Sequence, residues 1–197
     1  MNKTVEFYFD VGSPTSYLAY TQLVKICERT SSTLIYLPML LGGVFKATGN
    51  ASPNEVAAKA RYSIIDLQRF ARRYDVPLNF NPYFPINTLN IMRAVIAVQR
   101  LQPERFIHFI DCIFQALWIN RLNLNDLAVL SDVLRQAGFD PDEVFKWVND
   151  PLIKDQLKST TDAAVQRGVF GAPSMFIENE LFFGQDRLDF IREVLSA

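Results

Sequence analysis

The chain has 197 residues, of which 49% are hydrophobic and 21% charged, and its formal net charge is -1. This length and this hydrophobic content fit one globular core with room for an inserted subdomain, and they exclude an intrinsically disordered chain. Twenty basic residues balance twenty-one acidic ones. Because no basic surplus is present to attract phosphates, we expect no nucleic-acid partner.

The two cysteines, Cys27 and Cys112, lie far apart in apolar helical patterns and form no CxxC motif, as expected of buried structural thiols. The single histidine, His108, fits a helix residue better than a catalytic base. One histidine and two distant cysteines do not form a zinc-type ligand set. The longest apolar run, residues 37–45, is far shorter than the roughly 20 residues of a membrane helix. No secretory signal opens the sequence. We therefore expect a cytoplasmic protein without a metal or a membrane partner.

The N-terminal quarter predicts a strand–helix–strand unit. Residues 4–10 (TVEFYFD) are rich in aromatic and β-branched residues and predict a buried strand, 14–29 predict a helix, and 33–38 predict a second strand. Strands joined by one helix are typically parallel. Residues 40–53 (LLGGVFKATGNASP) predict a glycine-bearing loop that ends this alternation.

Residues 54–149 predict only helices, because apolar residues recur there at helical spacing and proline and asparagine clusters separate the segments. A long helix is expected to follow residue 54. The later helices are expected at about 88–101, 103–119, 124–137 and 141–149. We interpret this region as a helical insertion subdomain.

The C-terminal segment predicts a helix at 151–168, a hairpin of strands 174–178 and 181–183, and a last helix at 186–196. The whole order is that of a thioredoxin-like fold with helices inserted in its middle.

The predicted fold class is therefore α/β, a thioredoxin-like fold with an inserted all-helical subdomain. Residues 1–53 and 150–197 are expected to form the thioredoxin-like domain, and 54–149 the inserted all-helical subdomain.

Ser13 and Pro14 form a strand-to-helix corner, because serine is a favoured helix cap and proline suits the first helical position. The simpler interpretation is that Ser13 only caps, accepting the backbone N–H of Thr15 or Ser16. A capping hydroxyl keeps its donor hydrogen, which we expect to be free at the positive end of the helix dipole.

In thioredoxin-like folds the same corner carries a CxxC motif and stabilises a thiolate. Here serines occupy both cysteine positions. We infer that the chain cannot exchange disulfides itself but is suited to stabilise a thiolate that a ligand brings.

Pro173 precedes a predicted strand in GVFGAPSMF (168–176), where thioredoxin-like folds carry a cis-proline. A cis bond there is expected to leave the N–H and C=O groups of Ala172 free to pair with an extended peptide. The alternative is an ordinary edge-strand proline.

Gln185 and Asp186 lie in FFGQDRL (182–188), just before the last predicted helix. With the neighbouring amides they are suited to bind a carboxylate and an ammonium side by side, as in an amino-acid head group. The alternative is that Asp186 simply caps the last helix.

Taken together, these motifs resemble those of the 2-hydroxychromene-2-carboxylate isomerases and of their relatives, the kappa-class glutathione transferases, within the DsbA-like thioredoxin superfamily. The resemblance covers residues 4–197. It rests on four segments in the same order: VEFYFDVGSPTSYLAY, LLGGVFKATGN followed by Lys59, GVFGAPSMF and FFGQDRL.

The resemblance implies a glutathione site in which Ser13 is the catalytic residue, because its hydroxyl would hydrogen-bond the glutathione sulfur and favour the thiolate. Asn50 and Lys59 match contacts after the glycine loop, with Lys59 meeting the glycine carboxylate. Alternatively, Lys59 only pairs with Glu55 along a helix. The full set of implied glutathione-binding residues is Ser13, Pro14, Thr15, Asn50, Lys59, Ala172, Pro173, Gln185 and Asp186.

At the other end of the implied ligand, Ala172 matches the backbone pair to the cysteinyl part, and Gln185 and Asp186 match the γ-glutamyl contacts. The sequence departs from the family at Thr15, where relatives often carry an aromatic residue, and at Ser52, where they carry a proline.

The resemblance implies glutathione-dependent isomerisation of an aromatic ring-cleavage intermediate, 2-hydroxychromene-2-carboxylate, to trans-o-hydroxybenzylidenepyruvate through reversible addition of the thiolate. One alternative is a kappa-class-like transferase that conjugates electrophiles. Another is a non-catalytic thioredoxin-like module that binds peptides at the Pro173 edge. The family also implies a homodimer. Trp118 and Trp147 fit the core, although either is suited to wall an aromatic substrate pocket.

Overall fold

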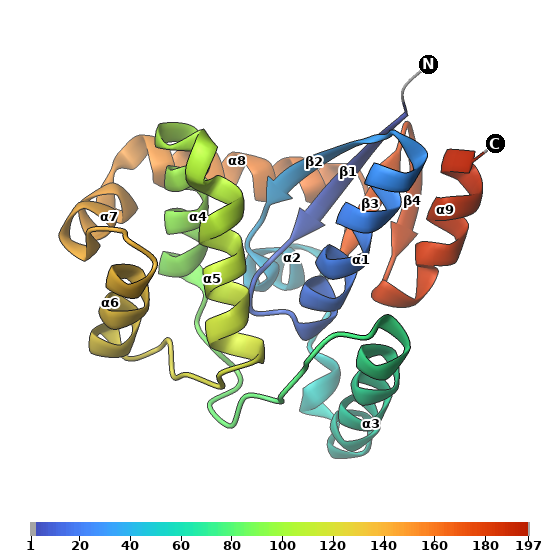
Figure 1. Cartoon of the computed structure of the whole chain (residues 1–197), viewed down its shortest axis with the longest axis horizontal. Helices are drawn as coiled ribbons and strands as arrows, with labels where there is room; N and C mark the ends of the chain where they lie inside the picture. The colour runs from blue at the N-terminus through green and yellow to red at the C-terminus, as the bar shows by residue number, and fades with distance from the viewer. Residues whose placement is uncertain (1–2, 197) are drawn as a thin grey trace.

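The computed structural model describes residues 3–196, which form a four-stranded sheet with helices on both faces (Figure 1). The strand order is β2-β1-β3-β4, with β1 parallel to β2 and antiparallel to β3, and β3 antiparallel to β4. The predicted strand–helix–strand unit and the predicted hairpin are confirmed. The strands are β1 (Thr4–Phe9), β2 (Thr33–Pro38), β3 (Ser174–Ile177) and β4 (Glu180–Phe183).

The hairpin turn lies one residue earlier than the sequence predicts, at residues 178 and 179. Ile177 pairs with Glu180, so Glu180 belongs to β4, and Glu178 adopts a positive φ of 57°. Glutamate at such a φ is uncommon, which is why the sequence placed the turn at the following pair.

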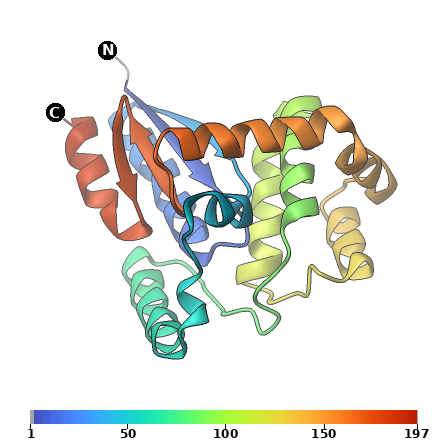
Figure 2. The same cartoon turned by 180° about the vertical axis from the view of Figure 1, so that it is seen from behind.

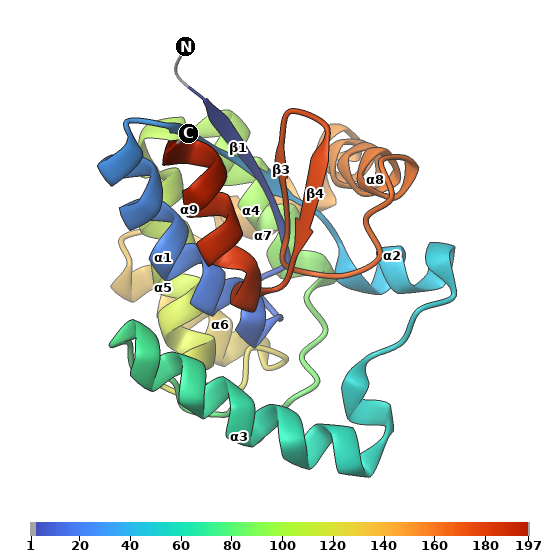
Figure 3. The ribbon, with the colours of Figure 1, turned by 90° about the vertical axis from the view of Figure 1, so that its right-hand side faces the viewer.

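Helices α1 (Pro14–Thr30) and α9 (Leu188–Ser196) cover one face of the sheet, and α2 (Leu41–Thr48) and α8 (Pro151–Gln166) cover the other (Figures 1 and 2). Figure 3 shows the two helical layers on either side of the strands, seen nearly edge-on. The predicted α/β fold class is thereby observed in the arrangement of the chain.

Helices also fill the stretch between α2 and α8. Four of them gather beside the sheet, and α3 lies apart from these, under the lower ends of α1 and α9 (Figures 1 and 3). The helices are α3 (Ala57–Tyr74), α4 (Leu89–Leu101), α5 (Phe106–Trp118), α6 (Leu127–Gln136) and α7 (Pro141–Asn149), with short 3-10 turns at η1 (Pro53–Glu55), η2 (Pro103–Arg105) and η3 (Gln185–Arg187).

Helix α2 contradicts the prediction of a loop through residues 40–53. Gly42 and Gly43 weigh against a helix, since glycine costs about 1 kcal/mol relative to alanine in a helix interior. The side chain of Leu40 offers no cap, but the carboxylate of Asp10 accepts the N–H of Leu41 at 2.9 Å. The cap therefore comes from a strand distant in sequence, where a local pattern cannot show it.

The main hydrophobic core runs from the sheet into the inserted helices. Phe9 on β1 packs against Phe114 on α5 with ring centroids 6.3 Å apart, and both side chains are fully buried. A smaller cluster containing Tyr8, Met39 and Phe176 lies on the α2 and α8 face. The division into two domains stays a prediction, because packing continues across the proposed boundary.

Among residues 3–196, no helix is both long and apolar enough to cross a membrane. Cys27 is buried and Cys112 is half-buried, and neither forms a disulfide. Burial raises the pKa of the Cys27 thiol to about 11, so this thiol stays protonated at neutral pH and is a structural residue, as predicted.

Candidate active site

The Ser13 corner stands where β1 ends and α1 begins. Ser13 is only 4% exposed, and its Oγ accepts the N–H of Ser16 at 3.1 Å. Pro14 is the first helical residue, and the Ser13 carbonyl accepts the N–H of Tyr17 at 3.1 Å. The predicted cap is confirmed, and it fixes Ser13 Oγ over the first turn of α1.

The donor hydrogen of Ser13 is not free, which corrects the prediction. Ser13 Oγ lies 2.7 Å from Thr15 Oγ1 and 3.3 Å from the Ala172 carbonyl oxygen, and Thr15 Oγ1 donates to the same carbonyl at 3.0 Å. The Ala172 C=O was predicted to be free as well, and it is instead an acceptor for both hydroxyls. Sequence alone could not show how close this loop comes to α1.

Two backbone donors at this corner have no acceptor within residues 3–196, namely the N–H groups of Thr15 and Ala172. The Ala172–Pro173 bond is cis, as predicted. The first turn of α1 contains no acidic residue, so no side chain there neutralises the positive end of the helix dipole. The corner is therefore suited to bind an anionic group.

Ser16, the second serine of the motif, is fully buried, and its hydroxyl is the one enclosed side-chain polar atom in the described chain that lacks a hydrogen-bond partner. A ligand at the surface cannot reach it. Such an unpartnered hydroxyl costs about 1–3 kcal/mol. Of the two serines, only Ser13 can contact a ligand.

A buried carboxylate that the sequence analysis missed holds the corner in place. Asp10 is 1% exposed and accepts three hydrogen bonds: from Gly12 N–H and Leu41 N–H, both at 2.9 Å, and from Thr88 Oγ1 at 3.0 Å. Its carbonyl also accepts the Ser13 N–H at 3.0 Å. Burial raises the pKa of Asp10, and the hydrogen bonds from Leu41, Gly12 and Thr88 oppose that shift. The available signal was an aspartate directly after the aromatic run at residues 7–9 (FYF).

The inserted helices also hold the backbone between Asp10 and Ser13. The N–H of Val11 donates to the Met92 sulfur at 3.4 Å, and the Val11 carbonyl accepts from Trp118 Nε1 at 2.8 Å. A Cβ on Gly12 would lie 2.6 Å from Thr88 Cγ2, so only glycine allows this close approach. Trp118 is thus a buried support for the corner.

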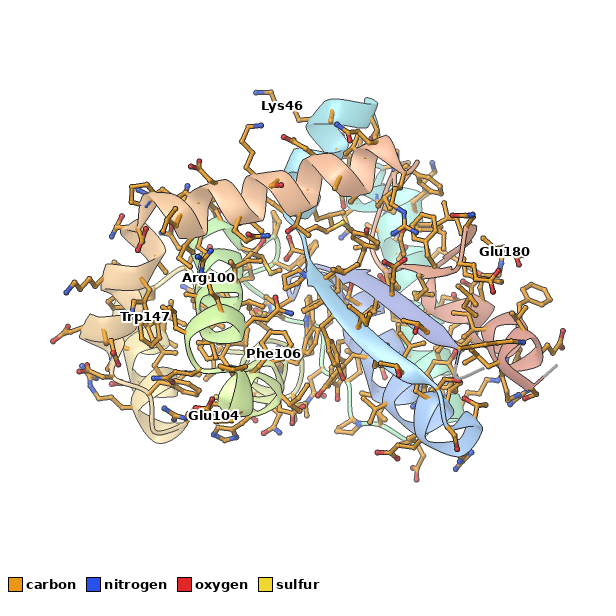
Figure 4. All side chains as sticks on the ribbon, turned by 90° about the horizontal axis from the view of Figure 1, so that it is seen from above. Lys46, Arg100, Glu104, Phe106, Trp147 and Glu180 are labelled. Carbon is orange, nitrogen blue, oxygen red and sulfur yellow. The ribbon has the colours of Figure 1, made fainter. Side chains whose placement is uncertain are left out.

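Trp147, the other tryptophan, lies on α7 among the inserted helices. Figure 4 shows it on α7, at the opposite side of the molecule from Glu180 on β4. It packs against the hydrophobic core. Both tryptophans belong to or pack against the core, as the sequence predicted, and the suggestion that one of them walls the substrate pocket stays a prediction.

Asn50 lies beside the proline loop. Its Nδ2 donates to the Phe170 carbonyl at 2.8 Å, and its Oδ1 accepts the N–H of Ala51 at 2.8 Å. Phe170 is two residues before Ala172, whose carbonyl contacts Ser13 Oγ, so Asn50 and Ser13 contact the same loop. The structure brings these two predicted residues into one region.

Gln185 joins the same region through backbone contacts. The Gly184 N–H donates to the Pro173 carbonyl at 3.0 Å, and the Gln185 carbonyl accepts from the Tyr74 hydroxyl at the end of α3. Gln185 is 7% exposed. Its side-chain amide makes no hydrogen bond within residues 3–196, and the atoms of that amide are not fully enclosed. This side chain is therefore available to a ligand.

Asp186 is exposed and does not cap the last helix. It lies inside η3, where Gly184 occupies the cap position, and its carboxylate pairs with Arg187. The alternative role given to Asp186 by the sequence is therefore wrong, because the last helix proper begins two residues later, at Leu188.

Lys59 is exposed on the first turn of α3 and forms no ion pair within residues 3–196. The alternative pairing with Glu55 is absent because Glu55 lies in η1, and Val56 between them is extended. Within residues 3–196, no hydrogen bond or ion pair joins Lys59 to the other predicted residues. Lys59 lies on α3, the helix that crosses below the lower ends of α1 and α9 (Figure 3).

Comparison with known proteins identifies the family. Residues 4–196 match the family model of the DSBA-like thioredoxin domain. The 2-hydroxychromene-2-carboxylate isomerase of Sphingobium xenophagum is 34% identical over 99% of both chains. The chain belongs to this isomerase family, within the DsbA-like thioredoxin proteins. Both the predicted family and the prediction of an enzyme are thereby confirmed.

Two further comparisons agree with this family. Glutathione S-transferase kappa 1 of Caenorhabditis elegans is 28% identical over 98% of this chain and 90% of its own length. A solved structure of a 2-hydroxychromene-2-carboxylate isomerase matches with a TM-score of 0.85 at 28% identity, covering 98% of this chain and 94% of that one. The DsbA-like fold class is confirmed.

We expect Asp10→Asn to lower the free energy of unfolding by about 2 kcal/mol, because the amide brings donors into a pocket whose three partners are all donors. Urea unfolding measures this. The matched control is Asp126→Asn, since exposed Asp126 caps α6 with the same kind of bond to Ala128 N–H and asparagine caps equally well. Equal losses in both variants would contradict the role given to Asp10.

Proposed function

We propose that this enzyme is a glutathione-dependent isomerase that converts 2-hydroxychromene-2-carboxylate to trans-o-hydroxybenzylidenepyruvate. The observation that carries the proposal is the Ser13 hydroxyl at the N-terminus of α1, facing the Ala172 carbonyl across the cis-proline loop, with the unpartnered N–H groups of Thr15 and Ala172 beside it. The names of the isomerase and kappa transferase relatives support the substrate and glutathione.

The residues present fit glutathione, a peptide with two carboxylates, one ammonium group and one thiol. The Ala172 N–H is free to pair with the cysteinyl backbone. The unpaired Lys59 suits the glycine carboxylate, while the Gln185 amide and the Asp186 carboxylate suit the γ-glutamyl head group.

Three of the proposed ligand residues have more limited roles. Asn50 already uses one amide hydrogen and one acceptor position internally, so it contributes one N–H and positions the loop. Pro14 and Pro173 supply shape, because proline has no backbone donor.

Bound glutathione would supply a thiolate that adds reversibly to the conjugated carbon of the substrate and leaves after bond rotation. In the proposed complex, Ser13 would turn its hydrogen from Thr15 and the Ala172 carbonyl toward the sulfur, and the first turn of α1 would add its positive field. Both effects favour the anionic form of a sulfur group and therefore lower its pKa. Because neither serine of the corner carries a thiol, the chain itself contributes no nucleophile there.

Ser13→Ala is expected to reduce glutathione-dependent turnover of 2-hydroxychromene-2-carboxylate by about 100-fold, as loss of one preorganised donor typically does. Conversion is followed by the absorbance of the ring-opened product. The control is Ser16→Ala, which removes a hydroxyl that is buried and unpartnered and should leave turnover within about twofold. Turnover by Ser13→Ala at the rate of the unmodified protein contradicts the proposal.

Lys59→Ala is expected to weaken glutathione binding about fivefold, which is the loss of one exposed charge pair. Binding of γ-glutamylcysteine, which lacks the glycine carboxylate, should not change. Isothermal titration calorimetry measures both affinities. Lys25→Ala removes another exposed lysine, on α1, and serves as the control. If both ligands weaken equally in Lys59→Ala, Lys59 does not bind the glycine carboxylate.

A second candidate function is conjugation of electrophiles, favoured by the similarity to kappa-class transferases from several animals. The same site serves both reactions, and they differ in whether the thioether is kept. Parallel assays with 1-chloro-2,4-dinitrobenzene and with 2-hydroxychromene-2-carboxylate rank them. Conjugation without isomerisation assigns the chain to the transferase function.

We also propose a homodimer and a cytoplasmic location. The dimer is supported by the family resemblance. The location is supported by the two cysteines, which form no disulfide within the described residues, as is typical of a reducing compartment.

A further inference from the structure

At the Ser13 corner, three oxygens share two hydroxyl hydrogens. Three oxygens lie within hydrogen-bonding distance of one another: Ser13 Oγ, Thr15 Oγ1 and the Ala172 carbonyl. Only two of them carry a hydrogen, one on each hydroxyl. Either hydroxyl can be the donor across the 2.7 Å contact between Ser13 and Thr15.

Two arrangements of these hydrogens fit the same atom positions. In the first, Ser13 donates to Thr15, and Thr15 donates to the Ala172 carbonyl at 3.0 Å. In the second, Thr15 donates to Ser13, which frees the Ser13 hydrogen from Thr15. The first gives the better neutral geometry, because the direct contact from Ser13 to the carbonyl is longer, at 3.3 Å.

A nearby anion reverses this preference. In the second arrangement Ser13 Oγ accepts from both Thr15 and the Ser16 N–H, so both of its lone pairs are used. A hydroxyl that accepts hydrogen bonds is polarised and becomes a stronger donor. Its bond to an anion is charge-assisted and roughly twice as strong as a neutral one, which offsets the bond lost at the Ala172 carbonyl.

We propose that Thr15 is a positioning residue that turns its hydroxyl from the Ala172 carbonyl to Ser13 when a thiolate binds, and thereby directs and strengthens the Ser13 donor. This inference rests on the proposed function, because it requires an anionic sulfur beside Ser13. It assigns Thr15 a role beyond contact with the ligand. No heavy atom has to move, since both acceptors of the Thr15 hydroxyl are already in place.

The position of Thr15 suits this role. It is the second residue of α1, directly after the conformationally restricted Pro14, and it is half-buried. A β-branched side chain has few allowed rotamers, so its oxygen is held between its two acceptors. Valine has nearly the same shape and lacks the hydroxyl, which makes Thr15→Val a clean removal of the donor.

The test measures the thiol pKa of bound glutathione from the pH dependence of thiolate ultraviolet absorbance, under saturating ligand. Thr15→Val is expected to raise this pKa by roughly half a unit, because Ser13 loses its polarising donor. Thr15→Ser keeps the hydroxyl and should stay near the value of the unmodified protein. In a Ser13→Ala background, Thr15→Val should have no further effect. Circular dichroism verifies that each variant is folded.

The competing role for Thr15 predicts the opposite sign. If Thr15 only braces the Ala172 loop and competes for the Ser13 hydrogen, its removal frees that donor, and the thiol pKa in Thr15→Val stays unchanged or falls. Either of these results, together with a raised pKa in Ser13→Ala, overturns this inference and leaves the proposed function intact. An unchanged pKa in Ser13→Ala, or no glutathione binding, overturns both.

Discussion

The carboxylate of Asp10 fixes the geometry on which the candidate site depends. Asp10 directly follows β1, and its three hydrogen bonds reach the corner at Gly12, the start of α2 at Leu41 and the residue before α4 at Thr88. Asp10 thus links the sheet, α2 and the inserted helices. Because these partners come from distant parts of the chain, the carboxylate sets where Ser13 stands relative to all of them. Burial disfavours the charged form of the Asp10 carboxyl group and raises its pKa, and this opposes the arrangement.

The corner keeps the electrostatics of a thioredoxin-like active site while replacing its sulfur chemistry. The helix N-terminus, the cis-proline loop and the free backbone donors remain, and these features stabilise a thiolate wherever it originates. In the proposed function, Ser13 takes the place of a thiol and acts as a hydrogen-bond donor. Ser16 occupies the buried position, where its hydroxyl finds no partner. The proposed division of labour follows: the protein supplies the field, and glutathione supplies the sulfur.

The sequence predicted those parts of the fold and site that local patterns specify. Strand and helix periodicity predicted the βαβ unit and the hairpin, and Ser13-Pro14 predicted the start of α1. Contacts between distant segments could not be predicted. The cap of α2 comes from Asp10, and the Ala172 carbonyl occupies the Ser13 and Thr15 hydroxyls. The family resemblance supplied the enzyme class, which the residues alone left open.

A crystal structure of the unmodified protein with glutathione tests the central claim most directly. The account predicts the glutathione sulfur within hydrogen-bonding distance of Ser13 Oγ, with the cysteinyl backbone paired to the Ala172 N–H. Glutathione bound away from this corner, or a Ser13 side chain turned from the sulfur into the protein interior, would contradict it.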